Sequence, residues 1–303
     1  MPATPVLPTT GQPTPVLSTV FSSVSSTASP TDPQPLQGLT FLNLRAAEDA
    51  PALTQALEAL GATVVERPVI AFVPPLSWEP FDTRLARLAP GDWIAFTSAT
   101  ALRWTLRRLA ELNRGPAHLQ GARIAAVGQG TARALADVGL RAVVTPAEQF
   151  QAEGLRDALL PALRPGEAVW LPRAEQGREA LVTGLAQAGH AVHVTPVYRT
   201  VAAEDGLGPV TELLERGAIG WIVFTSSSTV THFLALLPPR GRSWLERPRI
   251  ACLGRVTAQT AMAQGLTVHV VPERQDLPGL VNAIAAAVSP FAAQAGVRKP
   301  EQP

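Results

Sequence analysis

Four predicted strand-to-helix turns carry small and hydroxyl side chains that could bind an anion. Two of these turns contain the hydroxyl residues Thr97, Ser98, Thr225, Ser226 and Ser227. The other two place a glycine and then a threonine at the start of a helix, at Gly128, Thr131, Gly254 and Thr257. Some of these hydroxyls are expected simply to cap their helices. The free N–H groups and positive dipole end of each helix also suit a carboxylate or a phosphate.

Two arginines and one tyrosine add to this set. Arg45 and Arg173 each follow a predicted buried first strand, where a guanidinium could meet an anion or form a surface salt bridge. Tyr198 is the only tyrosine of the chain and lies in the stretch HVTPVYRT at 193–200. Its hydroxyl could take part in catalysis, or Tyr198 could be a packing residue whose hydroxyl reaches water. The residues alone leave both alternatives open for all three side chains.

Motifs for nucleotides, metals and activated serines are missing from the sequence. It contains no G-x-x-x-x-G-K-[ST], no G-x-S-x-G and no H-E-x-x-H. The stretch GQGTAR at 128–133 follows a predicted strand, but Arg133 stands where a dinucleotide turn has its third glycine. His190 and His193 would face opposite sides of a predicted strand, which does not suit a shared metal. We therefore expect neither a metal nor another cofactor.

Composition narrows the expected partners and compartment. The net charge of +1 gives no global sign of nucleic acid or of an anionic membrane surface. No apolar run reaches the ~20 residues that a membrane-spanning helix needs. Cys252 is the single cysteine, which fits a reducing cytoplasm. The Pro-, Ser- and Thr-rich residues 1–37 are expected to form a disordered extension, and residues 290–303 a disordered tail.

The remainder of the chain reads as a duplication. An offset of 128 residues places Arg45 on Arg173, and WIAFTSAT at 93–100 on WIVFTSSS at 221–228. Within each copy, short apolar runs alternate with segments of helical periodicity. This alternation predicts an α/β protein whose parallel sheets are covered by helices on both faces. We expect two flavodoxin-like, doubly wound domains of five strands each, related by internal duplication.

Two proline-bearing segments, 68–75 and 196–202, occupy the same place in the repeat and look like a two-segment connector between the domains. If the chain crosses between domains at both, one domain is discontinuous and the ligand binds in the cleft between the two. The domains would then be residues 38–68 plus 200–289, and residues 75–196. The alternative is two sequential domains divided near residue 165.

A set of features, in this order along the chain, resembles the uroporphyrinogen-III synthase family. It comprises the doubled FTS strand ends, the doubled G-x-x-T-A turns, PVYRT at 196–200 and VVPERQDLPGLVNAI at 270–284. The likeness spans about residues 38–288. No single motif is diagnostic of this divergent family, but the ordered set is fairly specific.

The resemblance implies two flavodoxin-like domains joined by a two-stranded connector, and a cofactor-free enzyme of tetrapyrrole synthesis. The implied substrate is hydroxymethylbilane, a linear tetrapyrrole that carries eight carboxylates. Members of the family remove water, close the ring and invert the last pyrrole, by what is thought to be a spiro-pyrrolenine intermediate. The product is uroporphyrinogen III, and the enzyme class is a carbon–oxygen lyase.

The resemblance also assigns roles to residues. Tyr198 matches a family tyrosine that is proposed to assist departure of the substrate hydroxyl. An ordinary phenol has a pKa of about 10, so it is protonated at pH 7 and can donate. The substrate-contacting candidates carried over are Thr97, Ser98, Thr131, Ser226, Ser227 and Thr257. Many relatives have a longer charged residue after the first FTS, where this chain has Ala99 and Thr100.

Expected partners follow from the same likeness. They are the small-molecule substrate and a transient contact with hydroxymethylbilane synthase, with no nucleic acid and no membrane. The chain is expected to be a cytoplasmic monomer. A rival reading is a two-lobed binding protein of the periplasmic type, which closes on a small anionic ligand without catalysis. A further rival is an interaction module that has lost its activity.

Overall fold

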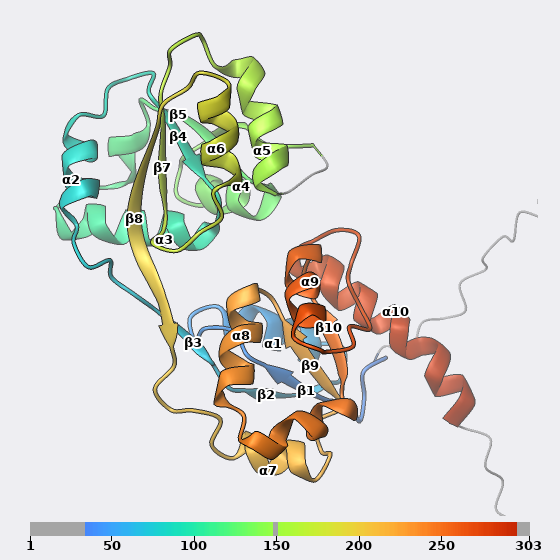
Figure 1. Ribbon diagram of the computed structural model, residues 1–303. Helices are drawn as coiled ribbons and strands as arrows, with labels where there is room; N and C mark the ends of the chain where they lie inside the picture. The colour runs from blue at the N-terminus through green and yellow to red at the C-terminus, as the bar shows by residue number, and fades with distance from the viewer. Residues whose placement is uncertain (1–33, 148–150, 296–303) are drawn as a thin grey trace, which may run out of the picture. The chain divides into compact units, whose positions relative to one another are not determined.

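The structure is a computed structural model that describes residues 34–147 and 151–295. The expected disorder of residues 1–33 and 296–303 lies outside the described residues. The described chain forms two sheets with flanking helices, and every neighbouring pair of strands is parallel except β3 (Ile70–Val73) and β8 (Val192–Ala202) (Figure 1). The predicted α/β class with parallel sheets is therefore confirmed.

The first sheet has the strand order β10-β9-β1-β2, and all neighbouring strands are parallel. Its strands are β1 (Thr40–Asn43), β2 (Thr63–Glu66), β9 (Trp221–Phe224) and β10 (Arg249–Cys252). All four residues of β9 are buried, as a central strand covered on both faces requires. In the register, Ile222 pairs with Leu42 on one side and with Ile250 on the other.

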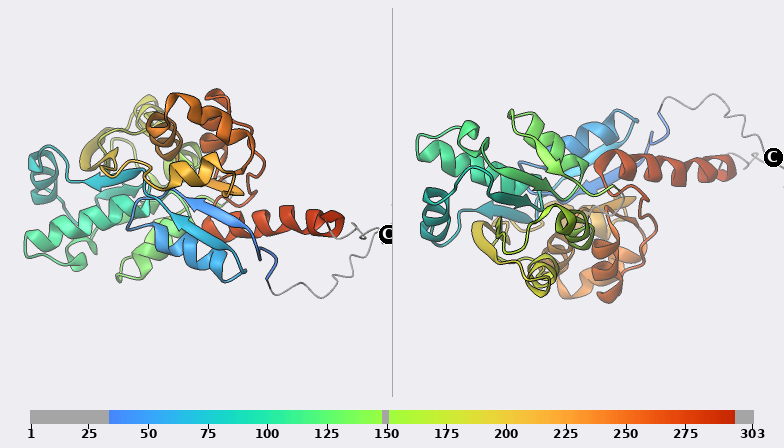
Figure 2. Two further views of the ribbon diagram at one scale, coloured as in Figure 1. Left: turned by 90° about the horizontal axis from the view of Figure 1, so that it is seen from below. Right: turned by 90° about the horizontal axis from the view of Figure 1, so that it is seen from above.

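Helices cover both faces of the first sheet (Figure 2). On one face, Phe224 packs at 5.7 Å from Phe233. That face is covered by α7 (Val210–Glu215), α8 (Ser227–Leu236), the 3-10 segment Pro239–Glu246 and α9 (Arg255–Ala263). On the other face, Phe41 stacks at 5.7 Å from Trp221. This second face is covered by α1 (Ala50–Glu58) and α10 (Leu277–Ala295).

The second sheet has the strand order β3-β8-β7-β4-β5-β6. Its strands are β3 (Ile70–Val73), β4 (Trp93–Phe96), β5 (Arg123–Ala126), β6 (Ala142–Val144), β7 (Val169–Ala174) and β8 (Val192–Ala202). All neighbours are parallel except β3 and β8. The sheet therefore combines a five-stranded parallel part with one antiparallel pair at its edge.

Helices also cover both faces of the second sheet. One face buries Phe81, Phe96 and Trp170 beneath α2 (Glu79–Ala86), α3 (Ala99–Glu111), the 3-10 turn Pro116–Leu119 and α4 (Gln129–Ala136). The other face buries Leu155 and Leu185 beneath α5 (Ala152–Leu159), the 3-10 turn Leu160–Ala162 and α6 (Ala180–Gln187). Both apolar cores are thus built from short buried strands and one apolar stripe of each helix.

The long strand β8 changes its partner midway. Its first part runs parallel to β7, and the last pair of that ladder joins Ala174 to Tyr198. Its second part runs antiparallel to β3, from the pair Val73–Arg199 to the pair Ile70–Ala202. Tyr198 therefore lies at the point where β8 leaves one ladder and enters the other.

The first sheet has four strands where five were expected. A single parallel bridge between Ala251 and Val270 stands in the place of the fifth strand. Nδ1 of the neighbouring His269 accepts the N–H of Ile250 at 3.0 Å. A side-chain acceptor thus takes a backbone donor that a longer ladder would need, which limits the pairing.

Two expected chain boundaries were wrong. Leu36, assigned to the disordered extension 1–37, is fully buried, and its N–H donates to the carbonyl of Leu60 at 2.9 Å. It packs with Leu53 and Leu57 because a large apolar side chain gains free energy when it leaves water. At the other end, α10 continues to Ala295 rather than ending near residue 289, as suits an alanine-rich segment.

Candidate functional site

A pocket of ≈ 260 Å³ brings four of the predicted site residues together at the carboxyl ends of β4 and β7. These residues are Thr97, Ser98, Arg173 and Tyr198. Ligand sites in open α/β sheets lie at this end of the strands. The pocket thus combines a phenol, two hydroxyls and a guanidinium in one place.

Tyr198 is held in the pocket by two aromatic neighbours. Its ring meets Phe72 of β3 edge-on at 5.2 Å, and stacks on Trp104 of α3 at 6.4 Å. Only 9% of the tyrosine is exposed. Burial raises the pKa of its phenol above the ordinary value, and a hydrogen bond with Ser98 opposes this shift. The phenol is therefore protonated at neutral pH and can donate a proton.

Ser98 serves the helix as well as the pocket. It is the N-cap of α3, where its Oγ accepts the N–H of Ala101 at 3.0 Å. This capping bond removes one free donor of the first helical turn. The predicted capping role of Ser98 is thus confirmed. Because Ser98 also lines the pocket, it could contact a ligand as well. Thr97 lines the same pocket one residue earlier.

Arg173 follows the end of the buried part of β7 and lies partly buried. Its Nη1 donates to the carbonyl of Arg178 at 2.9 Å, and its Nη2 pairs with the carboxylate of Glu179. Its Nε is buried and has no hydrogen-bond partner among the described residues. An unpaired buried donor is costly, so an anion at this position would be stabilised.

Gly128 and Thr131 do not line the pocket that contains Tyr198. Gly128 is the N-cap of α4 in an extended conformation, and Thr131 is buried in the first turn of that helix. The neighbouring Val127 does line the pocket. The first turn of α4 is therefore close to the site, although Thr131 itself is buried and does not line the pocket.

The remaining predicted residues belong to the first sheet and its helices. They are Arg45, Thr225, Ser226, Ser227, Gly254 and Thr257. Ser226 caps α8 reciprocally with Thr229, and the hydroxyl of Ser227 lies 2.7 Å from that of Thr260 on α9. Gly254 is the N-cap of α9, and Thr257 is buried in its first turn. The hydroxyls of Ser226 and Ser227 thus have local structural partners.

Arg45 follows β1 at the position that corresponds to Arg173. Its Nη2 lies 3.5 Å from a carboxylate oxygen of Asp49, and its Nε is buried without a partner among the described residues. Burial lowers the pKa of its guanidinium, and Asp49 opposes that shift. Arg45 thus forms the salt bridge that was one of its two predicted roles, and its Nε remains available to an anion.

Four polar or small residues of the pocket were not singled out from the sequence. They are Gln151, Gln176, Gly177 and Arg178. Three of them lie in the loop EQGREA that follows Arg173, where glycine and polar residues interrupt the strand pattern. A polar, glycine-containing loop after a buried strand is the signal that could have identified them.

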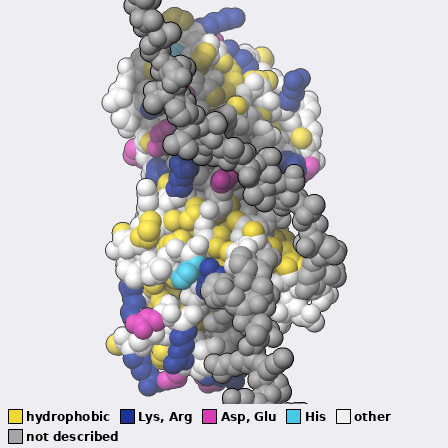
Figure 3. Space-filling view, turned by 90° about the vertical axis from the view of Figure 1, so that its right-hand side faces the viewer, with side chains coloured by type: hydrophobic (Ala, Val, Ile, Leu, Met, Phe, Trp, Pro, Cys, Tyr) yellow, Lys and Arg dark blue, Asp and Glu magenta, His cyan; other side chains and the backbone are white. Residues whose placement is uncertain are grey.

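The described residues show neither a cluster of metal ligands nor a membrane-spanning helix. Among the described residues, no group of three or more His, Cys, Asp and Glu side chains could hold a metal ion. No helix in the described part of the chain has both the length and the apolarity to span a bilayer. On the face visible in Figure 3, arginines are scattered rather than gathered in one stripe.

Comparisons with known proteins show which family the chain belongs to. A model of the family Uroporphyrinogen-III synthase HemD matches residues 51–282. The uroporphyrinogen-III synthase of Synechococcus elongatus is 34% identical over 256 residues, which cover 83% of this chain and 96% of that relative. The fold is similar to a mutant uroporphyrinogen III synthase from Thermus thermophilus, with 22% identity, a TM-score of 0.56 and coverage of 83% and 99% of the two chains. It is similar to uroporphyrinogen-III synthetase from Helicobacter pylori, with 19% identity, a TM-score of 0.52 and coverage of 85% and 99%. The chain belongs to the uroporphyrinogen-III synthase family.

Proposed function

We propose that the chain converts hydroxymethylbilane into uroporphyrinogen III, with loss of one water and inversion of the last pyrrole ring. The observation that carries this proposal is the pocket in which Tyr198 lies beside Ser98 and Arg173. It supplies one proton donor and several anion-binding groups, and the substrate has one leaving hydroxyl and eight carboxylates. On this reading the enzyme is a carbon–oxygen lyase that works without a cofactor.

Tyr198 protonates the leaving hydroxyl in this mechanism. The C–O bond breaks as the pyrrole nitrogen pushes its electron pair toward the reacting carbon, and water departs. A new C–C bond then joins the reacting carbon to the already substituted position of the last pyrrole, which gives the spiro intermediate. The bridge from that position to the neighbouring pyrrole breaks and re-forms at the free position of the last pyrrole, so the ring is inverted, and loss of one proton from that position restores the pyrrole. That proton balances the one taken from Tyr198. The raised pKa of the phenol suits a donor that must be protonated before each turnover.

The substrate carboxylates are held by helix N-termini, hydroxyls and arginines on both sheets. The proposed contacts are Thr97, Ser98, Gly128, Thr131, Arg45, Arg173, Thr225, Ser226, Ser227, Gly254 and Thr257. Such distributed contacts fix a flexible polyanion in one geometry, which lowers the entropic part of the barrier. The buried, unpaired Nε atoms of Arg45 and Arg173 support this assignment for the two arginines.

We also propose that the two sheets are flavodoxin-like domains that arose by duplication. Matching β1 with β7 makes the order β2-β1-β9-β10 equivalent to β8-β7-β4-β5, which supports this idea. The proposed domains are residues 38–68 plus 200–289 and residues 75–196, with β3 and the end of β8 as the connector. The substrate would bind in the cleft between them.

The test is to give the purified chain freshly generated hydroxymethylbilane and to separate the oxidised type I and type III products. A dominant type III isomer is expected. We further propose that the protein is a monomer in the cytoplasm, where it contacts hydroxymethylbilane synthase transiently. Type I product at the uncatalysed rate, from well-folded protein, would refute the proposal. Binding of carboxylate ligands without any product would then favour a two-lobed binding protein.

A further inference from the structure

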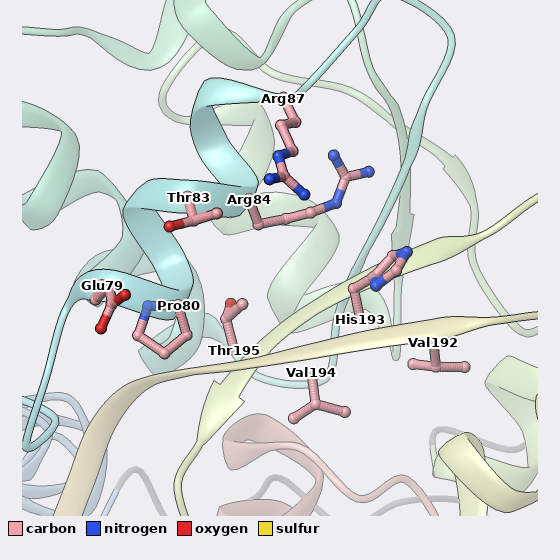
Figure 4. A pocket seen from close by; sticks show the side chains of 9 residues that line it. All are labelled: Glu79, Pro80, Thr83, Arg84, Arg87, Val192, His193, Val194 and Thr195. Carbon is pink, nitrogen blue, oxygen red and sulfur yellow. The ribbon is translucent and has the colours of Figure 1, made fainter.

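A groove of ≈ 760 Å³ lies between α2 and the first part of β8 (Figure 4). Its lining residues are Glu79, Pro80, Thr83, Arg84, Arg87, Val192, His193, Val194 and Thr195. None of them lines the pocket that contains Tyr198. Its volume lies within the range of about 300–1,000 Å³ that small-molecule sites occupy.

Cationic donors converge at one end of this groove. Arg84 and Arg87 are one helical turn apart, and Figure 4 shows their guanidinium groups side by side, with the ring of His193 facing them from β8. Glu79 lies at the opposite end of α2. The two neighbouring guanidinium groups repel each other. An anion between them would attract both and offset this repulsion.

Arg84 is held in place, yet it retains a free donor. Its Nη2 pairs with Oδ2 of Asp92 at 2.9 Å, and its guanidinium carbon lies 5.8 Å from the ring centre of Trp170. Its buried Nε has no hydrogen-bond partner among the described residues. Because the guanidinium is already ordered, binding of an anion would cost little additional side-chain entropy.

Arg87 is exposed and differs from Arg84 in having no fixed partner. In the described parts of the chain, its guanidinium forms no hydrogen bond and no ion pair. The carboxylate of Asp92 is used by Arg84 and by the N–H of Ala89. The charge of Arg87 is therefore available to a ligand.

The strand side of the groove offers further donors. Four consecutive residues, 192–195, line it although strand side chains alternate between faces, so the groove follows the outer edge of β8. That edge has no strand partner in the described chain until Arg199 pairs with β3. Thr195 accepts the indole N–H of Trp170 at 2.8 Å and keeps its own proton to donate.

A helix-dipole effect explains part of this arrangement. An acid in the first turn of α2 and arginines at its end complement the dipole of any helix. This effect does not require Arg84 and Arg87 to lie together opposite His193. It predicts a loss of helix stability when Arg87 is removed, and no change in anion binding.

We propose that this groove is a second binding site for a small polyanion that carries carboxylate or phosphate groups. The anionic groups lie between Arg84, Arg87 and His193, and the body of the ligand follows the open edge of β8. The site takes no part in the proposed ring closure, because its lining is separate from that of the Tyr198 pocket.

The test uses the full chain and isothermal titration with citrate and, separately, with inorganic phosphate. At least one of these probes is expected to bind, and the stronger of them identifies the preferred group. Arg87→Gln is expected to weaken this binding about tenfold or more. The matched control is Arg216→Gln, which removes an exposed arginine from the equivalent C-cap position of α7.

Three outcomes would overturn the proposal. One is the absence of binding of either probe, and another is equal weakening by Arg87→Gln and Arg216→Gln. The last is loss of binding in Arg173→Gln but not in Arg87→Gln, because the anion would then occupy the Tyr198 pocket. Thermal unfolding adds a second readout: the bound probe should raise the Tm of the wild type and not that of Arg87→Gln.

Discussion

At the scale of single residues, Tyr198 is both a packing residue of the core and the proposed proton donor of the site. Its ring belongs to the core of the second sheet, and its hydroxyl reaches a pocket that also contains Ser98 and Arg173. Tyr198 is thus a packing residue, and this packing does not conflict with the proposed catalytic role. Function and packing can be separated only by removing the hydroxyl alone.

Replacement of Tyr198 by Phe is expected to lower kcat by about 10²–10⁴-fold, the usual contribution of a positioned proton donor. The ring contacts with Phe72 and Trp104 remain, so the free energy of unfolding should change by about 1 kcal/mol or less. Steady-state kinetics and chemical denaturation measure the two effects. An unchanged kcat would remove Tyr198 from the mechanism.

Ser98 and Ser226 are both N-caps, and both are proposed substrate contacts. Each is the N-cap of a helix that follows a central strand, so each Ser→Ala change should cost about 0.5–2 kcal/mol of stability. If Ser98 also binds substrate, the change to Ala should additionally raise KM. Denaturation and kinetics on both variants test this prediction. Equal KM values in the wild type and in Ser98→Ala would leave Ser98 with its capping role alone.

At the scale of elements, β3 contributes to the site through Phe72, which meets the Tyr198 ring edge-on. Phe72→Leu should expose the phenol to more water, so its raised pKa should fall toward the ordinary value. A proton donor is lost when it ionises, so the alkaline limb of kcat should move to lower pH. A pH–rate profile measures this shift.

Phe233→Leu is the control for this prediction. Phe233 is fully buried in the core of the first sheet, and its truncation should destabilise the fold by about 1–3 kcal/mol without moving the alkaline limb. If both variants left the limb unchanged, Phe72 would have no electrostatic effect on Tyr198. If both moved it equally, the shift would come from general loosening of the fold.

The opposite, N-terminal edge of the second sheet is closed by an ion-pair network. Glu167 accepts hydrogen bonds from Arg123 of β5 at 2.7 Å, from the N–H of Arg164 at 2.9 Å and from the indole of Trp93 of β4 at 3.2 Å. These contacts, led by Arg123, lower the pKa of Glu167 from 4.5 to about 2. One carboxylate thus links the starts of neighbouring strands.

A carboxylate with a depressed folded-state pKa stabilises the fold above its unfolded pKa, and this stabilisation is lost as pH falls through the folded pKa. The window here runs from pH 4.5 to about 2. Glu167→Gln should lower stability at neutral pH and flatten the loss in that window, as followed by acid titration of circular dichroism. The control Glu58→Gln, on the exposed surface of α1, should leave the acid transition in place. An unchanged transition in Glu167→Gln would contradict this prediction.

At the scale of the whole molecule, the regular parts of the fold could be predicted from the sequence better than the irregular parts. Buried runs such as WIAF at 93–96 and WIVF at 221–224 identified the central strands and the hydroxyl turns after them, because burial and capping leave local signatures. The bridge at Val270 was not foreseen, because a local β-like pattern does not reveal that His269 takes a backbone N–H. Arg178 was missed because loop residues follow no period.

In the proposed duplication, the two copies differ at the position of Tyr198. Ile70 occupies it in the first copy, is 4% exposed and packs in the core of the first sheet with Leu42 and Leu44. Ile70→Tyr would place a larger ring and a hydroxyl in that core, at an expected cost of about 1–3 kcal/mol. Chemical denaturation measures this cost. Ile70 thus begins β3 and pairs with Ala202, whereas Tyr198 lies within β8 and pairs with Ala174, so the two positions have different surroundings.

The double variant Ile70→Tyr with Tyr198→Phe tests whether the phenol can act from either copy. Tyr198 lies on β8 and lines the same pocket as Thr97 and Ser98, whereas Ile70 is not among the residues that line it. We therefore expect the double variant to have the same low kcat as Tyr198→Phe, measured on folded protein at matched concentration. Recovery of kcat toward the wild-type value would show that the repeat is functionally symmetric at this position. The single phenol of the sequence would then be an accident of descent rather than a requirement of the site.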